Sequence, residues 1–177
     1  AFARNVDLNV VSLCDVNEPF LQKTLQAVSQ HQTTAPRTFA DYREMLRTEQ
    51  HDIVIIATPD HWHALPAIAA MQAGADVYLE KPVSVDVLEG EALVAAARRY
   101  DRVVQVNTQR RSTPCLVEAK EKYIRSGRLG RIGLVESYSF LPARSKNVFP
   151  DTAPPPHLNY VLWTGPAPMR AVKSGPR

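Results

Sequence analysis

Glu80, Lys81 and Pro82 are the residues of this sequence with the clearest capacity for chemistry. They follow the apolar run 77–79, which we predict to be a buried strand that leads into a helix. A lysine at the carboxyl end of a parallel strand points into the crevice where such sheets bind ligands. If that crevice excludes water, the Lys81 amine can exchange a proton with a substrate hydroxyl during hydride transfer, and Glu80 can tune that charge or orient a nicotinamide amide. The alternative is a solvent-facing lysine before a turn proline.

Asp15 has the position of a ribose-binding carboxylate. The apolar run 8–16 predicts a strand, and Asp15 lies near its end. In dinucleotide-binding sheets, an acidic residue about 20 residues after a glycine-rich turn accepts hydrogen bonds from the adenosine ribose. Because no glycine precedes Gly74, we expect the first strand and the phosphate-binding turn to lie before residue 1. An ordinary strand-terminating acid is the alternative for Asp15.

The segment 58–63 (TPDHWH) directly follows the apolar run 52–57, which predicts a strand buried on both faces. Backbone amides and a helix N-terminus at this edge can meet the diphosphate-linked ribose of a dinucleotide. Trp62 either stacks on the cofactor or packs in the protein. Two histidines beside an aspartate resemble metal ligands, but without a further partner we expect no metal. The candidate cofactor-binding residues of this segment are Thr58, Pro59, Asp60, Trp62 and His63.

Polar residues also follow the fourth predicted strand, 102–106. Asn107 and Gln109 come at the same predicted edge of the sheet. They line the nicotinamide pocket or begin a loop, and the sequence leaves both interpretations open.

The elements that position these residues alternate between strands and helices. Asn17 followed by Pro19 is typical of a helix start, the group 41–44 has the form of a capping box, and Ser84 is the expected cap of a further helix. Predicted strands cover 8–16, 52–57, 76–80 and 102–106, and other predicted helices cover 63–73 and a segment from 112 or 113 to 127. This alternation predicts an α/β fold with a doubly wound parallel Rossmann-type sheet that lacks its first strand.

The character of the sequence changes near residue 129. Residues 132–140 alternate between apolar and polar types, which predicts a half-exposed strand, and residues 141–177 hold eight of the fourteen prolines. We therefore expect an N-terminally incomplete dinucleotide-binding domain at 1–128 and the beginning of an α+β substrate and oligomerisation domain at 129–177.

Composition excludes several classes of function. The net charge is +3 with a pI near 9.0, but 21 basic residues are interleaved with 18 acidic ones, so we expect no nucleic-acid partner. No apolar run approaches the roughly 18 residues of a membrane span. Cys14 and Cys115 are far apart in apolar patterns, which favours reduced thiols. We expect a cytoplasmic protein, with an export signal before residue 1 left open.

Together these residues resemble the N-terminal domain of the Gfo/Idh/MocA oxidoreductases. The similarity covers almost the whole chain and is carried by an ordered series of segments: VVSLCDV, FADYREML, ATPDHWHALPAIAAMQAGADVYLEKP, SGRLGRIGLVES and HLNYVLWTGPAPMR. The resemblance implies a Rossmann domain followed by an α+β domain, NAD or NADP as cofactor, and hydride exchange with a sugar, inositol or related polyol.

The resemblance also implies roles for individual residues. Asp15 would contact the adenosine ribose and favour NAD, since a carboxylate repels a 2′-phosphate. Thr58, Pro59 and His63 would border the cofactor. Glu80 and Lys81 would face the nicotinamide and substrate, with Lys81 catalytic.

Three departures from the family pattern matter. The glycine turn is absent, Asn107 stands where the family often has a small residue, and the Asp/His pair that completes catalysis in many members would fall beyond residue 177. We therefore expect a fragment of an oxidoreductase that forms a homo-oligomer when full length. Two alternatives stay open, namely an NAD-dependent glycosidase of the same fold and a non-catalytic truncated binding module.

Overall fold

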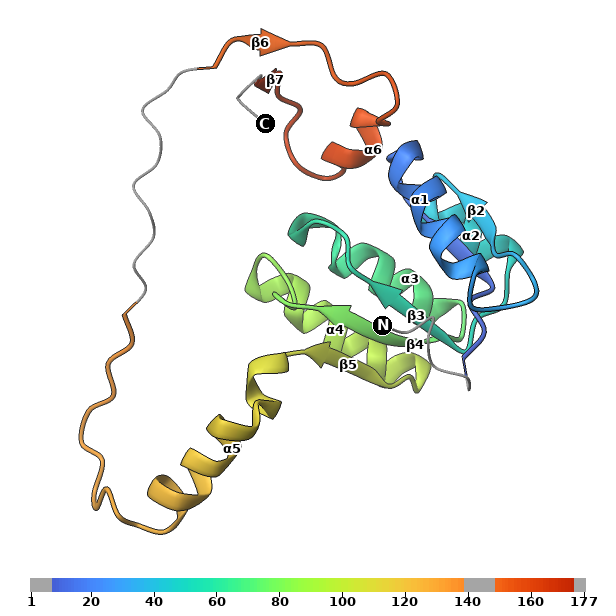
Figure 1. The fold of residues 1–177 in the computed structure, drawn as a ribbon. Coiled ribbons are helices and arrows are strands. Elements are labelled where there is room, and N and C mark those ends of the chain that lie inside the picture. Colours follow the sequence, from blue (N-terminus) through green and yellow to red (C-terminus); the bar gives the residue numbers. More distant parts are fainter. Residues whose placement is uncertain (1–7, 139–148, 174–177) are drawn as a thin grey trace. The chain divides into compact units, whose positions relative to one another are not determined.

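The computed structural model describes residues 8–138 and 149–173 (Figure 1). The chain divides into two compact units, one formed by residues 1–107 and 151–173 and the other by 108–150 and 174–177. The domain boundary expected between residues 128 and 129 stays a prediction.

The strands of the first unit are parallel, as the sequence predicts. Strand β1 (Ser12–Cys14) pairs with β2 (Arg37–Phe39), and β3 (Ile53–Ile56), β4 (Asp76–Glu80) and β5 (Val104–Asn107) form a second sheet in that order. Among the described residues β1 and β3 are not paired with each other. The α/β class with parallel strands is confirmed, and β2 is a strand that the sequence analysis missed.

The predicted helix starts are largely correct. Helix α1 (Glu18–Ser29) begins after Asn17, whose side chain accepts a hydrogen bond from Phe20 N at 3.3 Å. Helix α2 (Tyr42–Thr48) begins after Asp41, which accepts from Arg43 N at 2.9 Å. These side chains satisfy backbone donors that a helix leaves without an internal partner.

The expected cap at Ser84 is wrong. Helix α4 (Val87–Tyr100) begins after Asp86, whose carboxylate accepts from Glu89 N at 2.9 Å. The Ser84 hydroxyl instead donates to the Asp86 carbonyl at 2.8 Å. A carboxylate forms a charge-assisted bond to the helix N-terminus and attracts its positive dipole end, so Asp86 takes the position that the neutral serine could also have filled.

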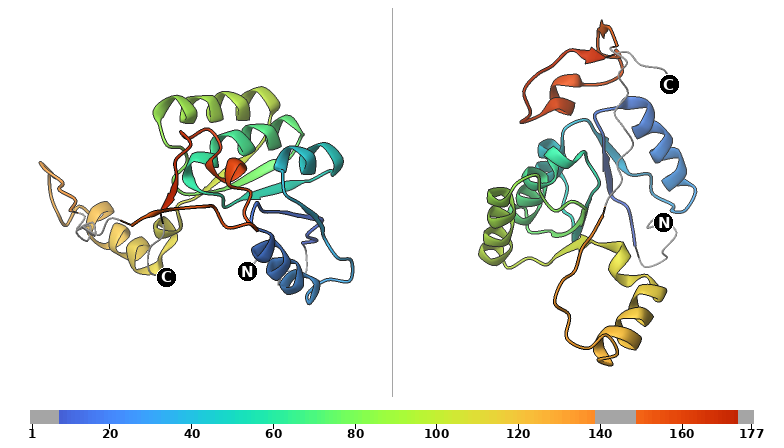
Figure 2. Two further views of the ribbon diagram at one scale, coloured as in Figure 1. Left: turned by 90° about the horizontal axis from the view of Figure 1, so that it is seen from above. Right: turned by 90° about the vertical axis from the view of Figure 1, so that its left-hand side faces the viewer.

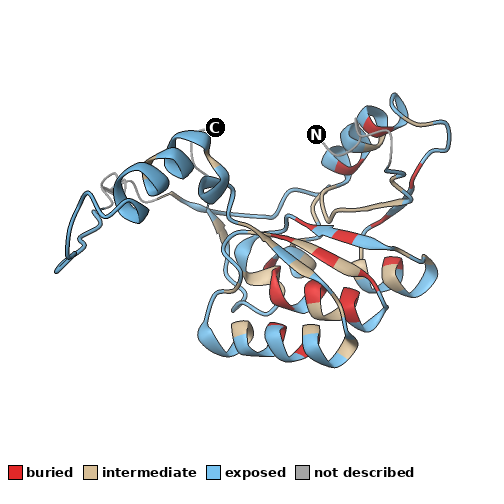
Figure 3. Cartoon of the chain, turned by 90° about the horizontal axis from the view of Figure 1, so that it is seen from below, coloured by how far each residue is buried: buried red, intermediate tan, exposed pale blue. Residues whose placement is uncertain are grey.

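One face of the β3–β4–β5 sheet carries the core. Helix α3 (Ala64–Gln72) packs against β3 and β4, and α4 packs against α3 (Figure 2). Buried residues gather on these elements (Figure 3). The alanines of α3 have little side-chain volume, which lets its backbone approach the sheet closely. The core cluster consists of Val54, Ile56, Ala64, Ala67, Ala70, Met71, Ala75, Val77, Leu79, Leu93 and Ala96.

Helix α3 ends where the sequence predicts. Gly74 follows the helix with φ of 90°, a left-handed conformation that glycine adopts without steric cost. The chain then enters β4, so this turn sets the start of the strand that ends at Glu80.

The second stretch of the first unit is short and irregular. Strands β6 (Asp151–Thr152) and β7 (Val172–Lys173) pair antiparallel, and helix α6 (Tyr160–Thr164) lies between them in sequence. Asn159 caps α6 by accepting from Leu162 N at 3.1 Å.

The second unit contains one longer helical segment. It comprises the 3₁₀ turn η3 (Gln109–Ser112), α5 (Pro114–Ala119) and the π-helical segment η4 (Lys120–Arg125). Residues 132–138 form no strand and are exposed, so the predicted strand is wrong over these residues, and residues 139–140 lie outside the described part. An alternating pattern becomes a strand only where a partner strand accepts its hydrogen bonds, and no described segment does so here.

Within the described ranges, no helix is both long and apolar enough to cross a bilayer.

Candidate functional site

Predicted site residues lie at the carboxyl ends of parallel strands in both sheets. Asp15 follows β1, Thr58 follows β3, and Lys81 follows β4 by one residue. Asn107 is the last residue of β5. In parallel α/β sheets this edge is where ligands bind.

A pocket of about 330 Å³ lies between β1 and β3 and reaches the carboxyl ends of both strands. Its lining residues include Asp15, Asp41, Thr58, Pro59, Trp62 and Trp163. The predicted residues Asp15, Thr58, Pro59 and Trp62 therefore come together in one cavity. Asp41 and Trp163 were not predicted as site residues. Asp41 was explained by its capping role, and Trp163 lies far along the sequence, in the part assigned to another domain.

Two carboxylates give this pocket an acidic wall. Burial, followed by the charges of Asp41 and Asp15, raises the pKa of the Cys14 thiol to about 12, so Cys14 stays protonated and is no nucleophile. The side-chain hydrogen bond from Arg43 lowers the pKa of Asp41, which keeps that carboxylate ionised. Asp15 also accepts from Asn17 N at 2.8 Å, which holds its carboxylate at the turn after β1.

Glu80 and Asn107 form the polar end of the β4–β5 pair. The strand register sets Glu80 opposite Asn107, and Asn107 Nδ2 donates to Glu80 Oε1 at 2.5 Å. The amide nitrogen of Lys81 donates to Glu80 Oε2 at 3.1 Å. The hydrogen bond from Asn107 and then that from Lys81 lower the pKa of Glu80. Glu80 is therefore an ionised, hydrogen-bonded carboxylate and a poor general acid, and Lys81 beside it is exposed.

His63 joins the turns that follow β3 and β4. Its side chain is 1% exposed, with Nε2 3.0 Å from the Thr58 carbonyl oxygen and Nδ1 in contact with the Pro82 carbonyl oxygen. A ring with both nitrogens on backbone carbonyls holds the two turns together. His63 is thus a buried link between the two turns, and its position beside the cofactor stays a prediction.

Replacing His63 by leucine should lower the free energy of unfolding by about 1–3 kcal/mol, because the buried ring loses its contacts with the Thr58 and Pro82 carbonyl oxygens. Urea unfolding of the complete protein measures this effect. His31→Leu is the matched control, since His31 is exposed and should change stability by less than about 0.5 kcal/mol. Equal midpoints for the two variants would refute the supporting role of His63.

Trp62 is fixed in the pocket wall by a hydrogen bond from its indole nitrogen and by a contact with another aromatic ring. Its Nε1 donates to the Leu162 carbonyl at 2.7 Å, and its ring meets Tyr42 edge-on with centroids 5.8 Å apart. These contacts show that Trp62 packs in the protein, which is one of its two predicted roles. Trp62 also lines the pocket, so its stacking on a cofactor stays a prediction.

The remaining predicted residues lie apart from the pocket lining. Asp60 is exposed in the 3₁₀ turn η2 (Asp60–Trp62), where its carbonyl accepts from His63 N at 3.2 Å. Gln109 belongs to the second compact unit, so its place at the nicotinamide stays a prediction. Among the described residues no group of three or more His, Cys, Asp or Glu side chains could hold a metal ion.

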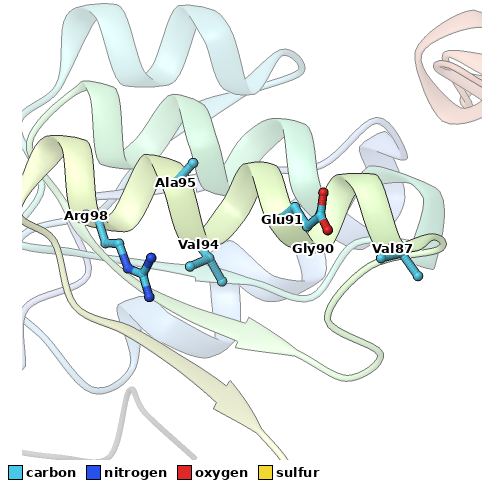
Figure 4. A pocket seen from close by; sticks show the side chains of 6 residues that line it. All are labelled: Val87, Gly90, Glu91, Val94, Ala95 and Arg98. Atoms are coloured by element: carbon cyan, nitrogen blue, oxygen red, sulfur yellow. The ribbon is translucent and has the colours of Figure 1, made fainter.

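Another hollow lies along α4 and is lined by that helix alone (Figure 4). Its charged groups are one acid and one base, Glu91 and Arg98, beside the small and apolar residues of the same helix. It has none of the strand-end residues on which ligand binding to parallel sheets depends. We therefore place the candidate site at the carboxyl edge of the strands.

Known proteins are similar to the N-terminal part of this chain. The family described as "Oxidoreductase family, NAD-binding Rossmann fold" (GFO_IDH_MocA) matches residues 1–108. Levoglucosan dehydrogenase of Pseudarthrobacter phenanthrenivorans is 39% identical over 93 residues, which cover 52% of this chain and 24% of that protein. Glycosyl hydrolase family 109 protein 1 of Shewanella sp. (strain ANA-3) is 32% identical over 95 residues, covering 51% and 21%.

Among solved structures, the WlbA dehydrogenase of Bordetella pertussis in complex with NADH and UDP-GlcNAcA superposes with a TM-score of 0.62 and 32% identity, covering 70% of this chain and 36% of that one. The matched part thus spans about a quarter of the curated relatives and about a third of the solved structure. The family match covers more than half of the chain, and the chain belongs to the Gfo/Idh/MocA oxidoreductase family, whose NAD-binding Rossmann fold it carries.

Proposed function

We propose that this chain is the cofactor-binding part of an oxidoreductase that transfers hydride between NAD and a sugar, inositol or related polyol. The carrying observation is that the carboxyl ends of the parallel strands hold a pocket with two carboxylates beside β1 and β3, and the Glu80–Lys81–Asn107 group at the ends of β4 and β5. The names of the related proteins, which include a levoglucosan dehydrogenase and a dehydrogenase bound to UDP-GlcNAcA, support a carbohydrate substrate.

The pocket residues fit a nicotinamide dinucleotide that lacks a 2′-phosphate. Asp15 would accept hydrogen bonds from the adenosine ribose hydroxyls. The pocket lining contains two carboxylates, Asp15 and Asp41, and no lysine or arginine. Asp41 is paired with Arg43, so the carboxylate that would repel a 2′-phosphate is Asp15, which favours NAD over NADP.

The other end of the edge supplies proton chemistry. When bound, NAD accepts or returns the hydride. The Lys81 amine would hold or move the proton of the substrate hydroxyl, because it follows β4 directly at the ligand edge. Glu80 is held by Asn107 and by the Lys81 amide, so its fixed negative charge would orient the lysine and the carboxamide of the nicotinamide.

Replacing Asp15 by asparagine should weaken NADH binding about tenfold, since charge-assisted hydrogen bonds to the ribose are lost. Binding of NADPH should stay unchanged or improve. Fluorescence titration of the complete protein with both nucleotides measures this difference. Asp52→Asn is the control because Asp52 is exposed before β3 and does not line the pocket. Wild-type protein that binds neither nucleotide would refute the proposed function.

A second candidate is an NAD-dependent glycosidase, in which retained cofactor transiently oxidises the sugar so that the glycosidic group is eliminated. The 32% identity to a glycosyl hydrolase family 109 protein favours it. Net NADH formation with a free sugar or polyol would establish the dehydrogenase, whereas release of an aglycone without net NADH would establish the glycosidase.

A further inference from the structure

Residues 157–165, which we call the strap, lie against the turn that follows β1. The Glu18 amide donates to the His157 carbonyl at 3.2 Å, and the Asn159 amide donates to the Val16 carbonyl at 3.0 Å. A β-bridge between Asn17 and Leu158 joins the same two segments. The strap therefore contacts the residues that directly follow Asp15, beside the acidic wall of the pocket.

The strap also contacts the turn that follows β3. Trp62 Nε1 donates to the Leu162 carbonyl at 2.7 Å, and His61 Nε2 lies 2.8 Å from the Trp163 carbonyl oxygen. These carbonyls belong to the last turn of α6, where a helix has no internal donors for them. Side chains of the TPDHWH segment thus satisfy the strap's backbone, which gives His61 and Trp62 a shared role.

Gly165 permits this close approach. A Cβ atom at this position would lie 2.3 Å from Cε2 and Cζ2 of Trp62, which is far inside van der Waals contact. The residue also has φ of 56° and ψ of −128°, a conformation that side-chain-bearing residues rarely adopt. The indole of Trp62 therefore occupies the space that any other residue at position 165 would need.

Two strap residues, Leu162 and Trp163, line the same pocket as Asp15 and Thr58. Trp163 stacks on Tyr160 with centroids 5.7 Å apart and an interplanar angle of 13°, and it meets His61 edge-on at 5.9 Å. It nonetheless keeps 40% exposure. An aromatic ring held by its neighbours but still partly open offers an ordered surface to a flat ligand.

We propose that the strap completes the adenosine end of the dinucleotide site, with Trp163 as the surface against which the adenine base packs. This inference rests on the proposed function, because it assigns the base of the same NAD molecule whose ribose Asp15 would bind. Asp15 and Trp163 line the same cavity, so the base of a dinucleotide whose ribose binds Asp15 would reach the Trp163 ring. Aromatic stacking supplies affinity without reading base edges, and the acidic wall supplies the ribose contact.

The test compares NADH with reduced nicotinamide mononucleotide, which lacks the adenosine half. In the complete protein, Trp163→Ala should weaken NADH binding about tenfold, the order expected for loss of one base–aromatic stack, and should leave mononucleotide binding within about twofold. Trp163→Phe retains a flat ring and should recover most of the NADH affinity.

Gly165→Ala tests whether the close packing of the strap against Trp62 is needed for NADH binding. The added methyl group collides with Trp62, so NADH affinity should fall as in Trp163→Ala, again without a change for the mononucleotide. Gly133→Ala makes the same chemical change where no atom lies within 4 Å and should have no effect.

The outcomes separate the two proposals. Wild-type protein without NADH binding overturns the proposed function. Wild-type binding that Trp163→Ala leaves unchanged, or a variant that weakens both nucleotides equally, overturns the role of the strap and leaves the NAD site itself standing.

Discussion

Lys81→Met in the complete protein should lower turnover at least about a hundredfold while NADH affinity stays within a few fold. Methionine keeps most of the side-chain length but cannot exchange a proton, so only the step that moves the hydroxyl proton is affected. Lys81 follows β4 directly and is exposed at the ligand edge, and its amide nitrogen holds Glu80. Steady-state kinetics and NADH titration together separate loss of chemistry from loss of binding.

Lys23→Met is the matched control, because Lys23 is exposed on α1. It should leave turnover within about twofold of wild type. Unchanged turnover in Lys81→Met would remove this lysine from the reaction. A parallel loss of NADH affinity would mean instead that Lys81 binds the cofactor.

Leu79→Ala should lower the free energy of unfolding by about 2–5 kcal/mol. Leu79 is 0% exposed in the middle of the three-stranded sheet, where it packs with the α3 side of the core. Truncation leaves a cavity in a packed core. Because Leu79 precedes Glu80 in β4, the position of the Glu80 side chain should also become less fixed. Urea unfolding followed by circular dichroism measures the change.

Leu88→Ala provides the comparison for this variant. The same atoms are removed, but Leu88 is 75% exposed on α4, and the change should cost less than about 0.5 kcal/mol. If Leu79→Ala were as stable as Leu88→Ala, the β3–β4–β5 core would not be the stabilising centre of this chain.

Local patterns predicted those parts of the fold that depend on neighbouring residues. The buried run ending at Glu80, the caps at Asn17 and Asp41, and the helix end at Gly74 all follow from side chains within a few residues. The three-residue strand β2 escaped prediction because Arg37–Phe39 is too short and polar for a periodic signal, and it is a strand through its pairing with β1. The strand prediction for residues 132–138 was wrong for the opposite reason. These residues have the alternating pattern of a strand, but no described segment pairs with them.

In the candidate site, too, some features follow from the local sequence and others depend on contacts between distant segments. Residue types and strand ends alone indicated Asp15, Thr58 and Lys81, because the carboxyl end of a parallel strand has a defined chemical use. Their contact with a cofactor stays a proposal. The pairing of Glu80 with Asn107 depends on the β4–β5 register, which no local pattern specifies.

Sequence alone was enough for the parallel α/β class, the family and the strand-end candidates, since each rests on short-range periodicity or on the order of motifs. Folding in three dimensions added what depends on contacts between distant residues. It buried His63 between two backbone carbonyls. It also brought Leu162 and Trp163 into the same pocket as Asp15, from which they are separated by about 150 residues in the sequence. Hydrogen bonds to backbone carbonyls explain why these contacts were invisible beforehand, because a carbonyl acceptor is the same in every residue and leaves no signature in the sequence.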